Sequence, residues 1–165
     1  KPDWLTCLAT LVYLKTDGTI SYQACPTEGC AKKVMEEGGP GQYRCERCNQ
    51  VFPRCDYRYV MTGQLEDVSG QQWVSLYNEQ GEQILGKTAE EMHHLRSEVN
   101  NLYISQDPEA FNQVFKEALY RQYVCKLKVK AEQYQGESKV KTQVVQISPV
   151  NWAEDSQRLL NLLEK

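Results

Sequence analysis

The chain has 165 residues, with 41% hydrophobic and 25% charged residues and a formal net charge of -3. These values are typical of one globular domain with a core of its own, and the acidic balance argues against a protein that binds nucleic acid over its whole surface. No run of about 18 or more apolar residues occurs, so a helical membrane span is not expected.

The predicted elements begin with a strand over Trp4 to Thr16, which is followed by a turn signal at Asp17-Gly18. A polar, cysteine-bearing segment covers residues 20–55. The alternation of apolar and polar residues predicts two further strands over 57–67 and 71–78. Residues 84–120 change to helical spacing, and strands are expected again over 123–134 and 138–150. A sequence that resembles a capping box at Asn151 begins a last helix.

This order predicts a mainly β fold. Five strands, with a helical segment between the third and the fourth, are typical of an OB-fold barrel. We expect a single domain over residues 1–165, with an inserted ribbon at 19–56 and a C-terminal oligomerisation helix at 151–165. The chain lacks an initiator Met, and we expect it to be part of a longer polypeptide.

The inserted segment carries two cysteine pairs, Cys25/Cys30 and Cys45/Cys48, in a C-x4-C and a C-x2-C pattern. The first residues of the chain resemble a strand rather than a secretory signal. Short paired spacings outside a secretory context indicate metal ligands in a reducing compartment, the cytosol or the nucleus. Four thiolates fill a tetrahedron, so the pattern favours one structural Zn²⁺ and a protein that is not an enzyme. Cys55 is a spare thiol, an alternative ligand or an ordinary neighbour of the ribbon.

Four other residues of chemical interest are given ordinary roles. Cys7 and Cys125 lie within strands and are expected to be small core residues. His93 and His94 are adjacent, and neighbours on a helix diverge by about 100°, so both are expected on the surface rather than at one shared site.

A candidate binding face follows from the alternation of two strands. In 123–134, lysines alternate with apolar residues, and in 71–78 two aromatics alternate with Val74 and Leu76. Because aromatic side chains can stack on bases while a basic groove holds phosphates, the pattern suits single-stranded nucleic acid. The alternative is a solvated lysine row beside aromatics packed under a loop. The candidate contact residues are Trp73, Tyr77, Tyr134, Arg58, Lys126, Lys128, Lys130, Lys32, Lys33 and Arg44.

The last helix carries more large apolar residues than an exposed tail would: Trp152, Leu159, Leu160 and Leu163. They must be buried against the barrel or against a partner.

The motifs DWLTCLATLVYL, YQACPTEGC, GQYRCERC, YRYVMTG, QQWVSLYNE and ILGKTAEEM resemble the C-terminal DNA-binding domain of the replication protein A large subunit, over essentially the whole chain. The resemblance implies a nuclear single-stranded DNA-binding heterotrimer used in DNA replication, repair and recombination. It also implies zinc on the four paired cysteines, and base stacking by Trp73, Tyr77 and Tyr134. The last helix would join one helix from each of two smaller OB-fold subunits.

Two other functions stay open at this level. The domain is alternatively a mainly structural heterotrimerisation hub, or it belongs to a paralogue specialised for telomeres or meiosis. A zinc enzyme is the least favoured function, because no open coordination site with a neighbouring acid or base is legible.

Overall fold

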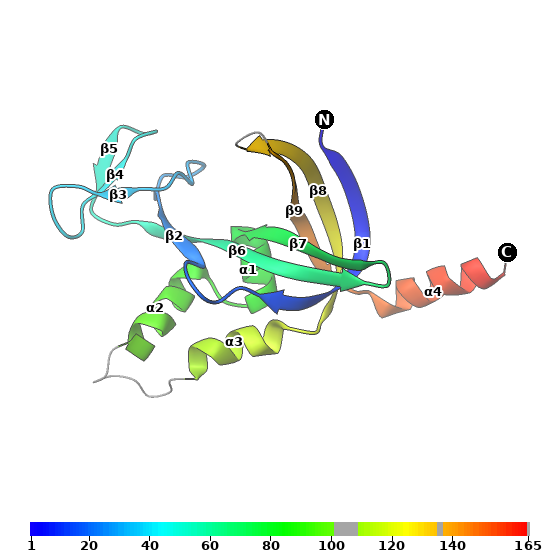
Figure 1. Cartoon of the computed structure of the whole chain (residues 1–165). Coiled ribbons are helices and arrows are strands. Elements are labelled where there is room, and N and C mark those ends of the chain that lie inside the picture. Colours follow the sequence, from blue (N-terminus) through cyan, green and yellow to red (C-terminus); the bar gives the residue numbers. More distant parts are fainter. Residues whose placement is uncertain (101–108, 135–136, 165) are drawn as a thin grey trace.

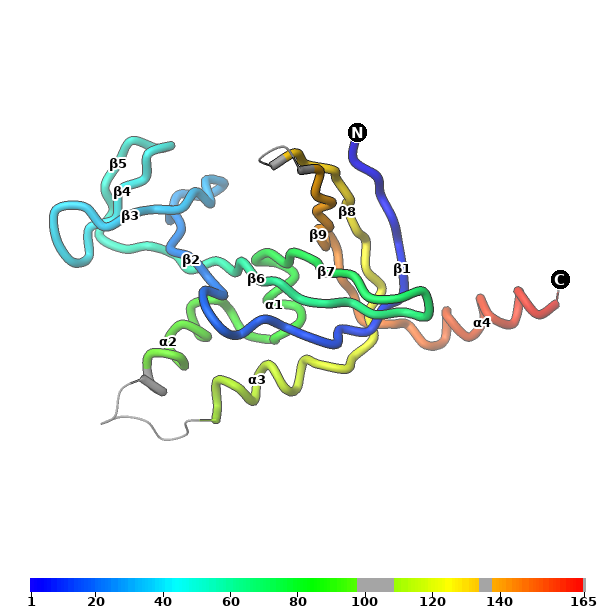
Figure 2. The backbone as a smooth tube through the Cα atoms, in the orientation of Figure 1, coloured from blue at the N-terminus to red at the C-terminus, as the bar shows by residue number. Residues whose placement is uncertain are grey.

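The computed structural model describes residues 1–100, 109–134 and 137–164, without the side chains of 98–100, 134 and 137 (Figures 1 and 2). Five long strands form the body of the molecule. They are β1 (Asp3–Leu14), β6 (Asp56–Asp67), β7 (Gly70–Tyr77), β8 (Gln122–Tyr134) and β9 (Glu137–Pro149).

The five strands close into a barrel. Their order is β1-β8-β9-β7-β6, and β1 closes the ring by pairing with β6 over Thr10 to Leu14. All of these pairings are antiparallel except that of β7 with β9, where Ser75 lies opposite Gln143. A sixth, short strand, β2 (Ser21–Ala24), extends the sheet along β6. This arrangement confirms the predicted OB-fold.

Two β-bulges bend the sheet. On β1 the register with β6 shifts between Leu11 and Tyr13, and on β9 the extra residue is Val145. A bulge resets the alternation of side chains by one position. Leu11 and Leu14 are therefore both buried in the barrel, while Tyr13 points outward.

Three helices pack against one another beside the barrel: α1 (Asn78–Leu85), which overlaps β6 and β7 in Figure 1, and α2 (Ala89–Asn100) and α3 (Ala110–Ala118), which lie below the barrel in that view. The predicted helical segment is thus present, but it begins at Asn78 rather than near residue 84. The buried side of α1 includes Gln80 and Gly81, which give no apolar period. The Gln80 amide instead donates a hydrogen bond of 3.2 Å to the Val145 carbonyl at the bulge of β9.

The last helix, α4 (Trp152–Leu163), projects away from the barrel (Figure 1). Its N-cap is Asn151, whose side-chain oxygen accepts a hydrogen bond of 3.4 Å from the Glu154 backbone N–H, as the predicted cap requires. No residue of α4 is buried. None of the described helices is long and apolar enough to span a membrane.

Candidate metal centre and nucleic-acid interface

The cysteine segment forms a small separate unit between β2 and β6, at the upper left of Figure 1. Its three-stranded sheet consists of β3 (Met35–Glu36), β4 (Tyr43–Cys45) and β5 (Gln50–Phe52). The buried residues of this unit are Val34 and three of the cysteines, so very little apolar surface holds it together.

Each cysteine pair lies on a tight backbone turn. The residue after the second cysteine of each pair, Ala31 or Asn49, is in the left-handed region, with φ of 48° and 51°. The first turn is closed by a hydrogen bond of 2.8 Å from the Cys25 backbone N–H to the Lys32 carbonyl. The Arg47 guanidinium joins the two turns, because it donates to the Cys30 carbonyl at 3.3 Å.

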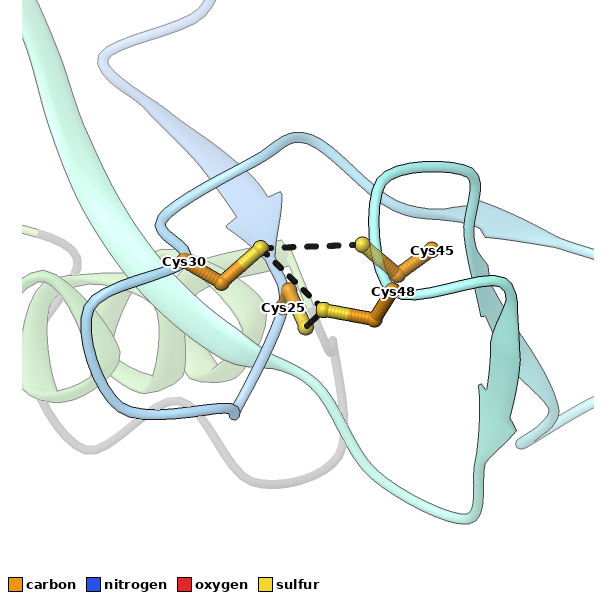
Figure 3. A group of neighbouring side chains, drawn as sticks. All are labelled: Cys25, Cys30, Cys45 and Cys48. Carbon is orange, nitrogen blue, oxygen red and sulfur yellow. Dashed lines mark hydrogen bonds between the residues drawn. The ribbon is translucent and has the colours of Figure 1, made fainter.

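The four sulfur atoms of Cys25, Cys30, Cys45 and Cys48 converge on one point (Figure 3) and all lie within 4.8 Å of one another. The Cys25–Cys48, Cys30–Cys45 and Cys30–Cys48 sulfur distances are 3.8, 3.7 and 3.5 Å. A tetrahedral Zn²⁺ with bonds of about 2.3 Å to sulfur requires neighbouring sulfurs about 3.8 Å apart. The cluster therefore has the donor set and the size of a four-thiolate metal site.

The thiols of the cluster differ in acidity. Burial opposes ionisation of Cys25, but hydrogen bonds with Thr27 and neighbouring thiols lower its pKa to about 7. A hydrogen bond with Cys30 is the main cause that raises the pKa of Cys48 to about 12. A metal that binds all four sulfurs as thiolates must displace their protons, so its affinity rises with pH.

The remaining cysteines lie outside this cluster. Cys55 packs against the ribbon without joining the four sulfurs, and burial raises the pKa of its thiol. Cys125 is a buried core residue of the barrel, as expected, and Cys7 packs against that core. His93 is half-buried and stacks on Tyr57 with ring centroids 4.0 Å apart, whereas His94 is exposed.

The outer face of β7 carries the two predicted aromatics. Trp73 is 51% exposed, and Tyr77 is half-buried at the start of α1. Tyr13 of β1, which the sequence did not suggest, meets Trp73 edge to face with ring centroids 5.7 Å apart. Tyr13 and Trp73 both lie opposite Gln64 of β6 in the sheet register, so the three side chains form one row on the barrel surface.

The basic candidates on the ribbon side are in different environments. Arg58 lies on β6, half-buried, opposite Tyr22 of β2. Lys32 and Lys33 are exposed and line a groove of ≈ 570 Å³ on the ribbon. Arg44 lines the same groove but is partly occupied, because it pairs with Glu37 at 3.2 Å and donates to Asn49 at 3.3 Å.

The lysines of β8 lie on the outer surface of the barrel, separated from β7 by β9. The ammonium groups of Lys126 and Lys128 lie 5.7 and 5.5 Å from the ring centroid of Trp4 on β1. Lys130 pairs with Glu132 at 3.5 Å. The side chain of Tyr134 falls outside the described part of the chain, although its backbone ends β8 opposite Glu137. Its predicted contact stays a prediction.

The apolar residues of α4 are all exposed. The exposed fractions range from 48% to 84% for the four predicted residues Trp152, Leu159, Leu160 and Leu163. None of these side chains is buried against the barrel. The sequence predicted that these side chains are buried either against the barrel or against a partner, and burial against the barrel is not observed in the described part of the chain.

Comparisons with known proteins agree with this geometry. The family model described as "Replication factor-A C terminal domain" matches residues 4–159. The Xenopus laevis "Replication protein A 70 kDa DNA-binding subunit" is 35% identical over 100% of this chain and 26% of its own length. The Schizosaccharomyces pombe "Replication factor A protein 1" is 34% identical over 99% of this chain and 25% of its own length. The chain thus spans about a quarter of the length of these relatives.

Two solved structures share the fold over nearly the whole chain. A chain of a replication protein A heterotrimer bound to single-stranded DNA superposes with a TM-score of 0.83 at 29% identity, covering 99% of this chain and 35% of that one. A chain of yeast RPA bound to single-stranded DNA gives a TM-score of 0.82 at 26% identity, covering 98% of this chain and 85% of that one.

Proposed function

Because the chain belongs to the replication factor-A C-terminal domain family, we propose that it is a single-stranded DNA-binding domain of a heterotrimeric replication, repair and recombination factor. The relatives' names and the DNA-bound structural neighbours support this function. The observation that carries it is the pair of aromatics on the outer face of β7, Trp73, which is half exposed, and Tyr77, four residues further along the strand.

Trp73 and Tyr77 are the proposed base-stacking platforms, together with Tyr134 at the end of β8. Stacking on aromatic side chains of single-strand-binding OB-folds, a class of which replication protein A is a standard example, is worth roughly 1–3 kcal/mol per base. The edge-to-face contact with Tyr13 already restricts the orientation of the Trp73 ring. The indole therefore loses less conformational entropy when a base stacks on it. The proposed phosphate contacts are Arg58, Lys126, Lys128, Lys130, Lys32, Lys33 and Arg44.

The four-thiolate cluster is proposed to hold one structural Zn²⁺. The cysteine spacing and the sulfur distances support zinc, and four protein ligands leave no coordination position for a reacting water. The metal would stabilise the ribbon at 19–56, whose own apolar core is too small to do so. Its role in DNA binding would be to hold Lys32, Lys33 and Arg44 beside the barrel. We therefore propose a domain without enzymatic activity.

Helix α4 is proposed to join the chain to two smaller OB-fold subunits. Its exposed apolar side chains require a partner, and the heterotrimer among the structural neighbours supports partner subunits. Residues 1–165 would thus form one domain with the assembly helix at 151–165, and the complex would act in the nucleus. The exposed helix also favours a second candidate function, a mainly structural hub in which DNA contact is incidental.

A binding titration separates these two functions. Single-stranded and double-stranded oligonucleotides are added to the chain at two salt concentrations, with and without a chelator. We expect preference for the single strand, and affinity that falls steeply with salt because phosphate contacts release counterions. The Trp73→Ala, Tyr134→Ala double variant should bind weakly. Unchanged affinity in that variant would exclude the aromatic face, and absence of DNA binding by the wild-type chain would leave only the hub.

A further inference from the structure

An exposed indole of β1 lies close to two lysines of the neighbouring strand β8. Trp4 is 54% exposed. The ammonium groups of Lys126 and Lys128 are 5.7 and 5.5 Å from its ring centroid, close enough for a cation–π attraction to each. An exposed tryptophan with two cations close to its ring combines a stacking surface with phosphate-binding charges.

The charges around Trp4 are not neutralised within the described chain. Neither Lys126 nor Lys128 forms an ion pair with any residue that the structure describes. Lys130 lies directly opposite Lys141 of β9, and like charges in that position destabilise a sheet. Glu132, on the same face of β8, pairs with Lys130 and lies opposite Lys139 of β9, so the cationic strip is confined to Lys126 and Lys128 beside Trp4, where it would favour an anionic ligand.

This strip is continuous with the proposed DNA-binding face. Trp4 lies opposite Lys128, Lys128 opposite Gln143, and Gln143 opposite Ser75, so one row crosses β1, β8, β9 and β7. Ser75 lies between Trp73 and Tyr77 on β7. Three strand spacings of about 4.8 Å place Trp4 about 14 Å around the barrel from Ser75.

We propose that Trp4, Lys126 and Lys128 form a second contact site for single-stranded nucleic acid, reached by a strand that crosses β9 from the Trp73 face. A base stacks on the exposed indole, and the two ammonium groups turn from the ring to the flanking phosphates. The inference rests on the proposed DNA-binding function and extends it, since the site is used only by a ligand long enough to span both faces.

The test compares two oligo-dT lengths, about 6 and about 20 nucleotides, because the usual site size of one OB-fold is about 4–16 nucleotides and only the longer strand exceeds it. Trp4→Ala should weaken binding of the longer strand roughly 5- to 140-fold and leave binding of the shorter strand nearly unchanged. Trp4→Phe should restore most of the affinity, because phenylalanine also stacks. Tyr120→Ala, which removes an exposed aromatic outside both faces, is the matched control. Trp73→Ala should weaken binding at both lengths.

A second measurement reports the phosphates. Lys128→Gln should reduce the slope of log affinity against log salt by about 0.7 for the longer strand, as the loss of one phosphate contact requires. Lys116→Gln on α3, where the lysine pairs with Glu109 at 2.9 Å, should leave that slope unchanged.

The outcomes are distinct for the two proposals. Full affinity of Trp4→Ala for the longer strand overturns the second site, whether or not Trp73→Ala weakens binding. Loss of assembly with the partner subunits in Trp4→Ala, with DNA affinity retained, also overturns it, in favour of a protein contact. Weak binding of the longer strand by Trp4→Ala with normal binding by Trp73→Ala would refute the proposed β7 face, and it would also overturn the proposed path from that face across β9. If the wild-type chain binds neither strand, both proposals fail.

Discussion

Replacing Gly81 by alanine sets helix propensity against packing. Gly81 is a buried residue of α1. A Cβ added there would lie against the side chain of Tyr59, 2.6 Å from its Cγ and 2.9 Å from its Cβ. Both distances are far below the sum of van der Waals radii, so either the helix or the tyrosine must move.

Tyr59 has little freedom to move. Its side chain is 0% exposed, and its hydroxyl donates a hydrogen bond of 2.8 Å to the carbonyl of Lys87, two residues before α2. Overpacking of a tight core costs about 1–3 kcal/mol, and a displaced ring would also weaken a hydrogen bond worth about 0.5–1.5 kcal/mol. The higher helix propensity of alanine returns about 1 kcal/mol. We expect Gly81→Ala to destabilise the chain by about 2 kcal/mol, which lowers the Tm by about 4–8 °C for a domain of this size.

Urea unfolding followed by circular dichroism measures this free energy of unfolding. The control is the exposed Gln83 in the same helix, where Gln83→Ala should be more stable than Gln83→Gly by about 1 kcal/mol. Glycine and alanine should therefore rank in opposite orders at the two positions. A Gly81→Ala chain as stable as wild type, or more stable, would refute the packing argument.

Three further predictions concern the metal, the pH and the last helix. Native mass spectrometry should detect one bound zinc in wild type and in Cys55→Ser, whereas Cys45→Ser should lose the zinc and bind single-stranded DNA more weakly with its barrel folded; retained zinc in Cys45→Ser would contradict the site. Burial and nearby cations lower the pKa of His93; the folded chain then binds fewer protons than the unfolded one, so stability should fall as pH drops below about 6.5, and less so in His93→Gln. The free energy of unfolding is measured by urea titration at several pH values. If it changes equally with pH in wild type and in His93→Gln, this linkage is excluded. Leu160→Asp should change the chain's own stability by less than about 0.5 kcal/mol, because the residue is exposed, while abolishing co-purification with its partner subunits; a large loss of intrinsic stability would indicate that α4 packs on the barrel.

Sequence patterns predicted the barrel strands and the thiol cluster because both are encoded locally. Alternation identifies which side chains of one strand share a face, and β7 follows it, with Val74 and Leu76 buried and Trp73 exposed. Cysteine pairs at short spacing require only a turn to bring two sulfurs together. The order of the predicted elements indicated an OB-fold with the two cysteine pairs inserted after the first strand. The structure confirms this architecture.

The features that were missed depend on distant parts of the chain. The start of α1 was hidden because its buried side uses Gln80 and Gly81, whose partners lie on β9 and β6. Tyr13 escaped notice because the bulge on β1 interrupts the alternation that would have assigned its face. Trp4 meets the lysines of β8 only through a register between strands more than a hundred residues apart, which neither sequence segment contains alone.

The ribbon and the barrel have separate buried clusters on one chain. Their buried clusters share no residue: Val34 and the cysteines form one, and the interior of the barrel with its three helices forms the other. The ribbon is anchored through β2, which pairs with the first half of β6, and β6 is held independently by β7 and β1. Loss of the metal should therefore disorder the ribbon while the barrel and α4 stay folded. DNA affinity would then respond to metal removal or thiol oxidation, whereas assembly through α4 would not.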